Sequence, residues 1–112
     1  MYYEHCDIVD VLFPYSDKPK FKQRPALLTV PNSQYKIPTY SVYQITSTQK
    51  YGNFILHIPE DYKYFGKTGL ITASYIDFRK HASIEENLII KKRGLYYDKN
   101  RINKFLKELH SY

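Results

Sequence analysis

Two apolar runs separated by a polar, basic loop constrain this 112-residue chain more than any other feature. Residues 7–30 read DIVDVLFPYSDKPKFKQRPALLTV, in which the first apolar run ends at Pro14 and Arg24-Pro25 opens the second. Short apolar runs bounded by proline and polar residues are typical of β-strands. We therefore expect a strand over residues 5–13, an exposed loop over 15–23 and a short, central strand over 26–30. A fixed cation, Arg24, would stand where the loop meets the second strand.

The rest of the chain continues this pattern of short strands and ends in one helix. Asp98 is a good N-cap, and the apolar residues that follow it recur at spacings of three and four, which predicts an amphipathic helix. Its role would be to cover the sheet. We expect further strands over residues 39–47, 53–58 and 70–79, a helix or strand over 84–90, and a helical stripe made by Ile102, Phe105, Leu106 and Leu109.

Composition places the chain among small, single-domain proteins. Hydrophobic residues make up 43% of it, which is enough for one packed core. The formal net charge of +6 favours a polyanionic partner such as nucleic acid. With one cysteine there is no internal disulfide, and with no long apolar run or signal-peptide pattern we expect a cytoplasmic protein that does not contact membranes.

The sequence offers no motif for a metal or a cofactor. The four histidines are scattered, and neither HxxxH nor CxxC spacing occurs. No glycine-rich phosphate loop and no GxSxG elbow is present. His5 and Cys6 are strand neighbours whose side chains would point to opposite faces, so they do not form a dyad. We expect neither a metal site nor a bound cofactor.

The side chains that remain can cleave RNA without a metal. The 2′-hydroxyl of RNA is itself the nucleophile, so the protein has to position the attack and stabilise charge on the phosphate. Arg24 suits the charge because its planar fork binds phosphate, whereas its high pKa makes it a poor base. The hydroxyls of Thr46 and Ser47 can orient a phosphate oxygen. We predict that Arg24 and Thr46 meet across the sheet, and the candidates for a general base are Asp77, His57 and His81.

Four ordered blocks give this chain a family resemblance. They are DIVDVLFPYSD, QRPALL at 23–28, QITS at 44–47 and GLITAS at 69–74, followed by IIKKRGLY at 89–96 and a helix. Together they resemble the MazF/PemK family of toxin ribonucleases over residues 5–109. Cys6 stands where that family usually has Gly.

This resemblance implies a fold and an activity. The fold would be a single domain over residues 1–112, mainly β with short helices, in which a bent antiparallel sheet forms an SH3-like barrel with a C-terminal helix. The activity would be metal-independent, sequence-selective cleavage of single-stranded RNA by a homodimer, inhibited by an antitoxin whose extended acidic tail occupies the RNA groove. Arg24 and Thr46 match the catalytic residues of the family, and the loop over 15–23 matches its substrate-covering loop.

The remaining site residues are expected to bind substrate. Basic and aromatic side chains would contact phosphates and bases, and the polar ones would orient them. Two alternatives stay open: a non-catalytic nucleic-acid-binding barrel, which would not need Thr46, and a toxin of the same fold that acts by binding a protein such as gyrase. The predicted substrate-binding residues are Phe13, Tyr15, Lys18, Lys20, Lys22, Gln44, Ser47, Asp77 and Arg79.

Overall fold

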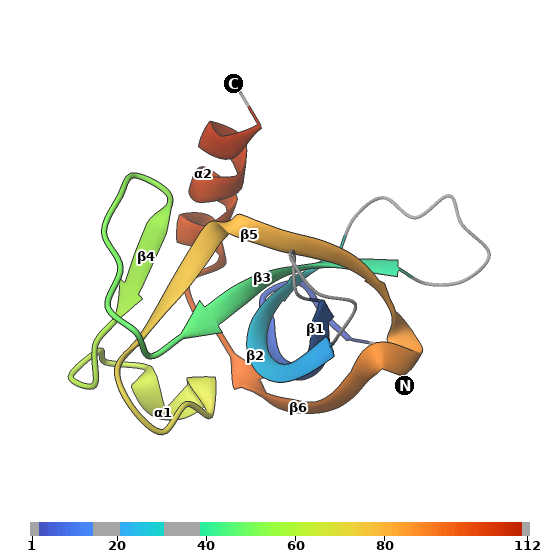
Figure 1. Ribbon diagram of the computed structural model, residues 1–112. Helices are drawn as coiled ribbons and strands as arrows, with labels where there is room; N and C mark the ends of the chain where they lie inside the picture. The colour runs from blue at the N-terminus through green and yellow to red at the C-terminus, as the bar shows by residue number, and fades with distance from the viewer. Residues whose placement is uncertain (1–2, 15–20, 31–38, 111–112) are drawn as a thin grey trace.

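The computed structural model describes residues 3–14, 21–30 and 39–110, and in them it is mainly β (Figure 1). The described part holds six strands, two short α-helices and one 3-10 turn at Glu86–Leu88. None of its helices is long and apolar enough to cross a membrane. The elements are β1 (Asp7–Pro14), β2 (Phe21–Thr29), β3 (Thr39–Thr46), β4 (Ile55–Ile58), α1 (Phe65–Thr68), β5 (Ser74–Glu85), β6 (Ile89–Leu95) and α2 (Lys99–Leu109).

The strands form one bent antiparallel sheet in the order β4-β5-β3-β2-β1-β6. In Figure 1 the sheet curls so that β5 and β6 pass on opposite sides of β1 and β2. Among the described residues β4 and β6 are edge strands, so strand pairing does not close the sheet into a barrel. The predicted class, mainly β with short helices and a bent antiparallel sheet, is confirmed, as is the central position of β2.

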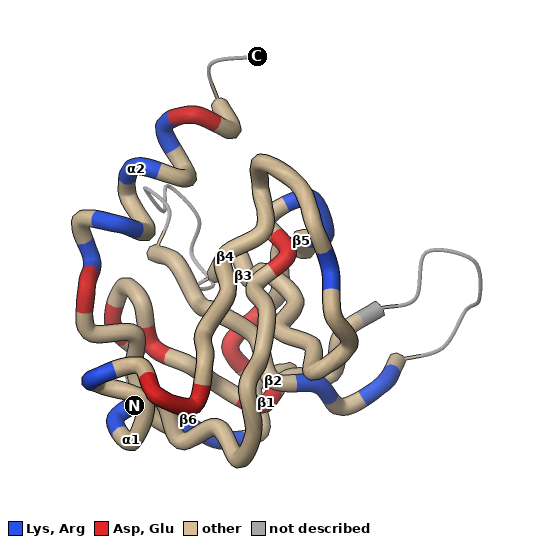
Figure 2. Tube along the Cα trace, turned by 90° about the vertical axis from the view of Figure 1, so that its left-hand side faces the viewer, with Lys and Arg blue, Asp and Glu red and all other residues tan. Residues whose placement is uncertain are grey.

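The C-terminal helix forms as the sequence predicts. The Asp98 carboxylate caps α2 by accepting a hydrogen bond from the backbone N–H of Arg101 at 3.1 Å. Phe105 stacks on Phe78 of β5, with ring centroids 5.0 Å apart, and Ile102 is fully buried. Lys and Arg recur along the helix (Figure 2). The apolar stripe therefore covers one face of the sheet.

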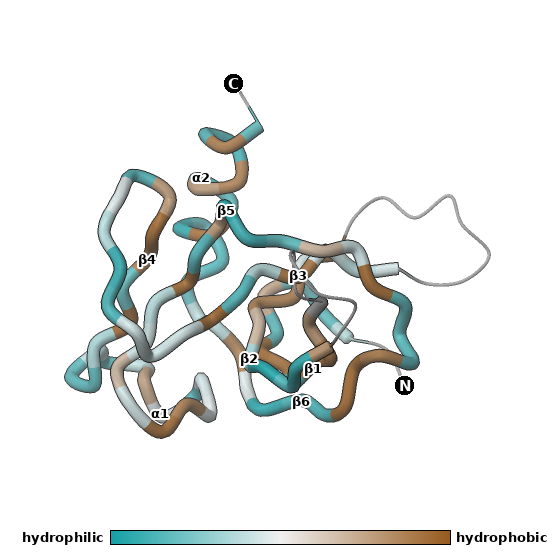
Figure 3. Tube along the Cα trace, viewed as in Figure 1, coloured by the Kyte–Doolittle hydropathy of each residue, from teal (hydrophilic) through white to brown (hydrophobic). Residues whose placement is uncertain are grey.

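The bent sheet has an apolar cluster on each face. Figure 3 shows apolar segments both in the strands around β1 and in α2. Because side chains alternate along a strand, Ile8 and Leu27 join the cluster beneath α2, while Val9 and Ala26 join the other cluster. Each buried aliphatic side chain contributes about 1.5–3 kcal/mol, so burial on both faces favours this curvature over a flat sheet.

Strand β2 begins earlier than the sequence predicts. We expected Phe21 to Gln23 in the loop and a strand starting at Ala26, but β2 already starts at Phe21. Pairing with β1 decides this, because Pro14 faces Phe21 and Val11 faces Arg24. Arg24 is thus held inside a strand rather than at its start. Residues 15–20 of the predicted loop lie outside the described residues.

The second half of the chain also departs from the predicted boundaries. The fifth strand was expected over 70–79, but β5 runs from Ser74 to Glu85, since its far half pairs with the start of β3. Residues 84–90 become the end of β5, the 3-10 turn and the start of β6. The predicted connection over 59–69 contains the short helix α1, and β4 covers the last four of the six residues of the predicted 53–58 strand.

Cys6 precedes β1 in a backbone conformation that glycine adopts without steric cost. Its φ is +73°, and it is the one non-glycine residue with positive φ in the described part of the chain. Its N–H donates to the Leu28 carbonyl at 2.8 Å, and its own carbonyl accepts from Tyr96 at 2.9 Å. Burial raises the pKa of the Cys6 thiol to about 11, so the thiol is protonated at neutral pH.

Candidate active site

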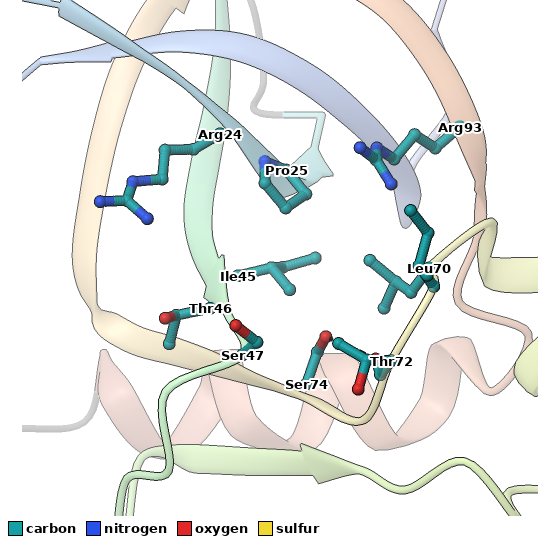
Figure 4. Close-up of a pocket in the computed structure, with 10 residues that line it drawn as sticks. Arg24, Pro25, Ile45, Thr46, Ser47, Leu70, Thr72, Ser74 and Arg93 are labelled. Atoms are coloured by element: carbon teal, nitrogen blue, oxygen red, sulfur yellow. Dashed lines mark hydrogen bonds between the residues drawn. The ribbon is translucent and has the colours of Figure 1, made fainter.

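An open pocket of about 200 Å³ lies where β3 ends and β5 begins (Figure 4). Arg24 and Pro25 of β2 line it together with the end of β3 and the segment that leads into β5. In Figure 4 the guanidinium groups of Arg24 and Arg93 lie on either side of Pro25, and hydroxyl groups lie along the opposite side. The lining residues are Arg24, Pro25, Ile45, Thr46, Ser47, Leu70, Ile71, Thr72, Ser74 and Arg93.

Arg24 and Thr46 come together through the pairing of β2 with β3. Ala26 pairs with Gln44 in this antiparallel pair, so Arg24, two residues before Ala26, and Thr46, two residues after Gln44, lie next to each other at the same end. Residues two apart share a face of a strand, so both side chains project on the same side of the sheet. The structure therefore brings two residues 22 positions apart in the sequence to one pocket.

The Thr46 hydroxyl is oriented by its own turn. Thr46 is 8% exposed, and its Oγ1 accepts a hydrogen bond from the backbone N–H of Thr48 at 3.1 Å. A hydroxyl has one proton to donate and two lone pairs. With one lone pair occupied, the proton is left to donate toward the pocket, and no described residue accepts it.

Arg24 supplies a positive charge that no described carboxylate neutralises. It is half-buried, and no ion pair or hydrogen bond joins its guanidinium to the described residues. No Asp or Glu lines the pocket. An anion entering it would meet both the fork of Arg24 and the hydroxyl side of the cavity, which is the arrangement that binds phosphate.

Asp77 is buried and already fully engaged. It is 0% exposed, and its oxygens accept from Lys50 at 3.0 Å, from Arg79 Nε at 3.0 Å and from the Arg79 backbone N–H at 3.0 Å. Burial alone would raise its pKa, but the hydrogen bonds from Arg79 and Lys50 outweigh burial and leave the pKa below its ordinary value. Such a carboxylate is a weak base. Asp77 and Arg79 do not line the pocket.

The other predicted substrate-binding residues lie at different distances from the pocket. Ser47 lines it and is exposed. Gln44 is half-buried and lies two residues before Thr46 on β3. Lys22 is exposed on β2, and Phe13 packs against the apolar cluster on the face opposite α2. Tyr15, Lys18 and Lys20 lie outside the described residues.

Of the two histidines considered as a base, His57 lies nearer to Thr46. Thr46 is the cross-strand partner of Tyr75, and Tyr75 is the partner of His57, so the three residues form a row across β3, β5 and β4. His57 stacks on Tyr75 with ring centroids 4.5 Å apart. Neighbouring strands are about 4.8 Å apart, so His57 is roughly 10 Å from Thr46. His81 lies against Tyr43, further along β5.

Sequence reasoning missed one charged residue of the pocket. In the basic run 91–93 the two lysines are exposed, whereas Arg93 lines the pocket. The nearest signal in the sequence is Gly94. A Cβ there would lie 2.2 Å from the Lys67 carbonyl oxygen, so the glycine permits close approach of the segment that forms the pocket wall.

Comparison with family models and with curated proteins identifies no relative of this chain: no family model matches it, and no curated protein matches it. Among the described residues, no three His, Cys, Asp or Glu side chains are grouped closely enough to hold a metal ion. The polar groups that the pocket offers are arginines and hydroxyls.

Proposed function

We propose that this chain is a toxin endoribonuclease of the MazF/PemK type that cleaves single-stranded RNA without a metal ion. The proposal combines the four ordered sequence blocks with the pocket. One observation carries it: Arg24 and Thr46, the two residues that match the catalytic positions of the resembled family, line the same pocket from two different strands.

The residues of the pocket fit the needs of phosphodiester cleavage. The RNA 2′-oxygen bonds to the adjacent phosphorus as its proton departs, and the bond from phosphorus to the 5′-oxygen breaks as that oxygen takes up a proton. Charge grows on the non-bridging oxygens, which the Arg24 fork would bind bidentately. The Thr46 O–H would donate to one of those oxygens and hold it for in-line attack. Arg24 would remain protonated throughout.

The same resemblance leads us to propose two partners. One is an antitoxin whose extended acidic tail would compete with RNA for this basic pocket, and the other is a second copy of the chain. The net charge of +6 and the absence of carboxylates among the pocket residues support an acidic competitor. The first expectation is tested by asking whether an acidic peptide displaces bound RNA. The second is tested by light scattering, which measures the mass of the purified protein in solution.

The decisive experiment incubates the purified protein with a long single-stranded RNA in EDTA. Wild type should yield discrete fragments, whose ends give the cleavage sequence. Arg24→Ala and Thr46→Val should cleave about 10²–10³ times more slowly, which is the usual effect of removing one donor that stabilises transition-state charge. Thr46→Ser keeps the hydroxyl and should retain most activity. Lys104→Ala, an exposed residue of α2, is the matched control for a lost charge.

Other outcomes would replace this proposal. Intact RNA that wild type still binds in a salt-sensitive way would identify a non-catalytic nucleic-acid-binding barrel. Neither binding nor cleavage would favour a toxin that acts on a protein. Fragments that persist unchanged in Thr46→Val would place the chemistry elsewhere.

A further inference from the structure

Arg93 stands on β6 at a local irregularity of the sheet. Ile8 of β1 faces Gly94, but the next residue, Val9, faces Lys92, so Arg93 is an extra residue with no partner opposite it. A bulge of this kind re-aims the side chain of the extra residue and is frequent beside active sites. The neighbouring lysine side chains at 91 and 92 are 65% and 43% exposed, whereas that of Arg93 is 26% exposed and turned into the pocket.

A buried carboxylate holds Arg93 in this position. Arg93 Nε donates to Asp10 Oδ1 at 2.6 Å, and Asp10 is 1% exposed. Arg93 Nη1 lies 3.4 Å from the Gly69 carbonyl oxygen, which anchors the other end of the guanidinium. A buried ion pair contributes little to stability compared with a well-packed apolar pair. Its effect here is therefore best understood as fixing the direction of the arginine.

Arg93 keeps donors for a ligand after these contacts. A guanidinium has five N–H groups, and the described contacts use one on Nε and one on Nη1. No described residue accepts from Nη2, which belongs to a side chain that lines the cavity. Arginine stays charged under all ordinary conditions. The free edge of the fork is thus available to an anion in the pocket.

We propose that Arg93 binds a second phosphate of the substrate strand, next to the one that Arg24 grips, with Asp10 as its positioning residue. This inference rests on the proposed function. Arg24 on β2 pairs with Val11 of β1, whereas Arg93 on β6 lies beside Val9, so their backbones are two strands apart and offset along β1, roughly 12 Å in all. In Figure 4 their side chains lie on either side of Pro25. Two such cations match a polyanion that carries one phosphate per nucleotide rather than a single phosphate.

Binding to RNAs in which one phosphate at a time is made neutral tests the proposal. The probe is a 2′-O-methyl RNA of the mapped cleavage sequence, which lacks the nucleophile and stays intact, with one phosphate at a time made neutral as a methylphosphonate. For wild type, affinity should fall roughly tenfold at the scissile phosphate and at one neighbour, as expected when a charged hydrogen bond is lost. Arg24→Gln should lose only the sensitivity at the scissile phosphate.

Variants at Arg93 should show the reciprocal pattern. Arg93→Gln alone leaves the buried Asp10 with only the exposed Lys91 ammonium, 3.9 Å away, and can fail to fold. The Asp10→Asn/Arg93→Gln double variant avoids that, and thermal unfolding checks its fold. It should keep the tenfold loss at the scissile phosphate and show none at the neighbour, while Arg93→Lys should be intermediate. Lys104→Gln should keep both losses.

The proposal and the function beneath it fail in different ways. If wild type cleaves all-ribose RNA but the double variant keeps the same loss at the neighbouring phosphate, Arg93 does not bind phosphate and the inference is wrong while the ribonuclease stands. A wild-type profile with one sensitive phosphate only would overturn it as well. If wild type cleaves no RNA, the proposed function itself is contradicted.

Discussion

At the scale of single residues, burial decides which charged side chains are available for chemistry. Asp77 and Arg24 both lie close to Thr46 in the paired strands, yet Asp77 is enclosed by Lys50 and Arg79, while Arg24 has no partner among the described residues. A carboxylate with a lowered pKa and occupied oxygens stabilises the fold and does not take up protons near neutral pH. The cation without a partner is the one that can meet a ligand.

The engagement of Asp77 predicts how stability depends on pH. Its folded pKa lies below the unfolded value of about 3.9, so the unfolded state binds more protons and stability is lost as pH falls through that value toward the folded pKa. We expect Asp77→Asn to lower the free energy of unfolding by about 2 kcal/mol or more at pH 7, because it removes hydrogen bonds to an ionised carboxylate. The gap from wild type should narrow between pH 5 and pH 3, as followed by urea unfolding.

A surface carboxylate serves as the control for this experiment. Asp61 is exposed, and Asp61→Asn should change stability little at either pH. A gap between wild type and Asp77→Asn that is constant from pH 7 to pH 3 would show that the ionised form of Asp77 contributes nothing.

At the scale of elements, two glycines let α1 and β6 touch. A Cβ at Gly94 would lie 2.2 Å from the carbonyl oxygen of Lys67, and a Cβ at Gly69 would lie 2.3 Å from that of Arg93. Gly69 also has a φ of +72°, which disfavours any other residue. Because Leu70 follows directly and lines the pocket, this close approach sets the position of the pocket wall.

A side chain at Gly94 should therefore disturb both the stability of the fold and the position of the pocket wall. Gly94→Ala should destabilise the fold by about 1–3 kcal/mol through overpacking against backbone, and it should slow RNA cleavage because the wall moves away from Arg24. Gly66→Ala, within α1, has no atom within 4 Å of the added Cβ and should leave stability unchanged or slightly raised. Urea unfolding and RNA-cleavage rates are measured for both variants. Equal effects of Gly94→Ala and Gly66→Ala would refute the importance of the close contact at Gly94.

At the scale of the whole molecule, positive charge is distributed rather than concentrated. Figure 2 shows Lys and Arg on α2, on β5 and near β1 and β2. A net charge of +6 raises the local concentration of a polyanion around the protein, but general attraction does not select a site. A fixed site would need the pocket, in which Asp10 holds Arg93 in place and both arginines lie opposite hydroxyls.

This distinction predicts the salt dependence of RNA binding. Affinity for a single strand should fall linearly on a log–log plot of affinity against salt, with a slope of about −0.7 for each phosphate contacted. Arg24→Gln should reduce the magnitude of the slope by about 0.7, whereas Lys104→Gln should leave it unchanged. Filter binding at four salt concentrations measures both slopes, and identical reductions would mean that net charge rather than a fixed contact controls binding.

Local patterns in the sequence predicted the features that depend on near neighbours. Asp98 caps α2 because the capped N–H lies three residues away. Short runs of strand-forming residues placed β1 and β3 within a residue or two. Arg24 and Thr46 were singled out from residue type and block order, and the structure places both in one pocket. Whether they act there stays a prediction.

Only the tertiary structure decided the features that depend on distant pairing. Phe21 to Gln23 are strand because β1 pairs with them, and β5 extends beyond residue 79 because β3 does. The difference between Lys92 and Arg93 arises from one bulge against β1, together with a carboxylate 83 residues away. Hydrogen bonds across a sheet and buried ion pairs join residues with no sequence relationship, so a local pattern contains the residue types but not the neighbours that determine their roles.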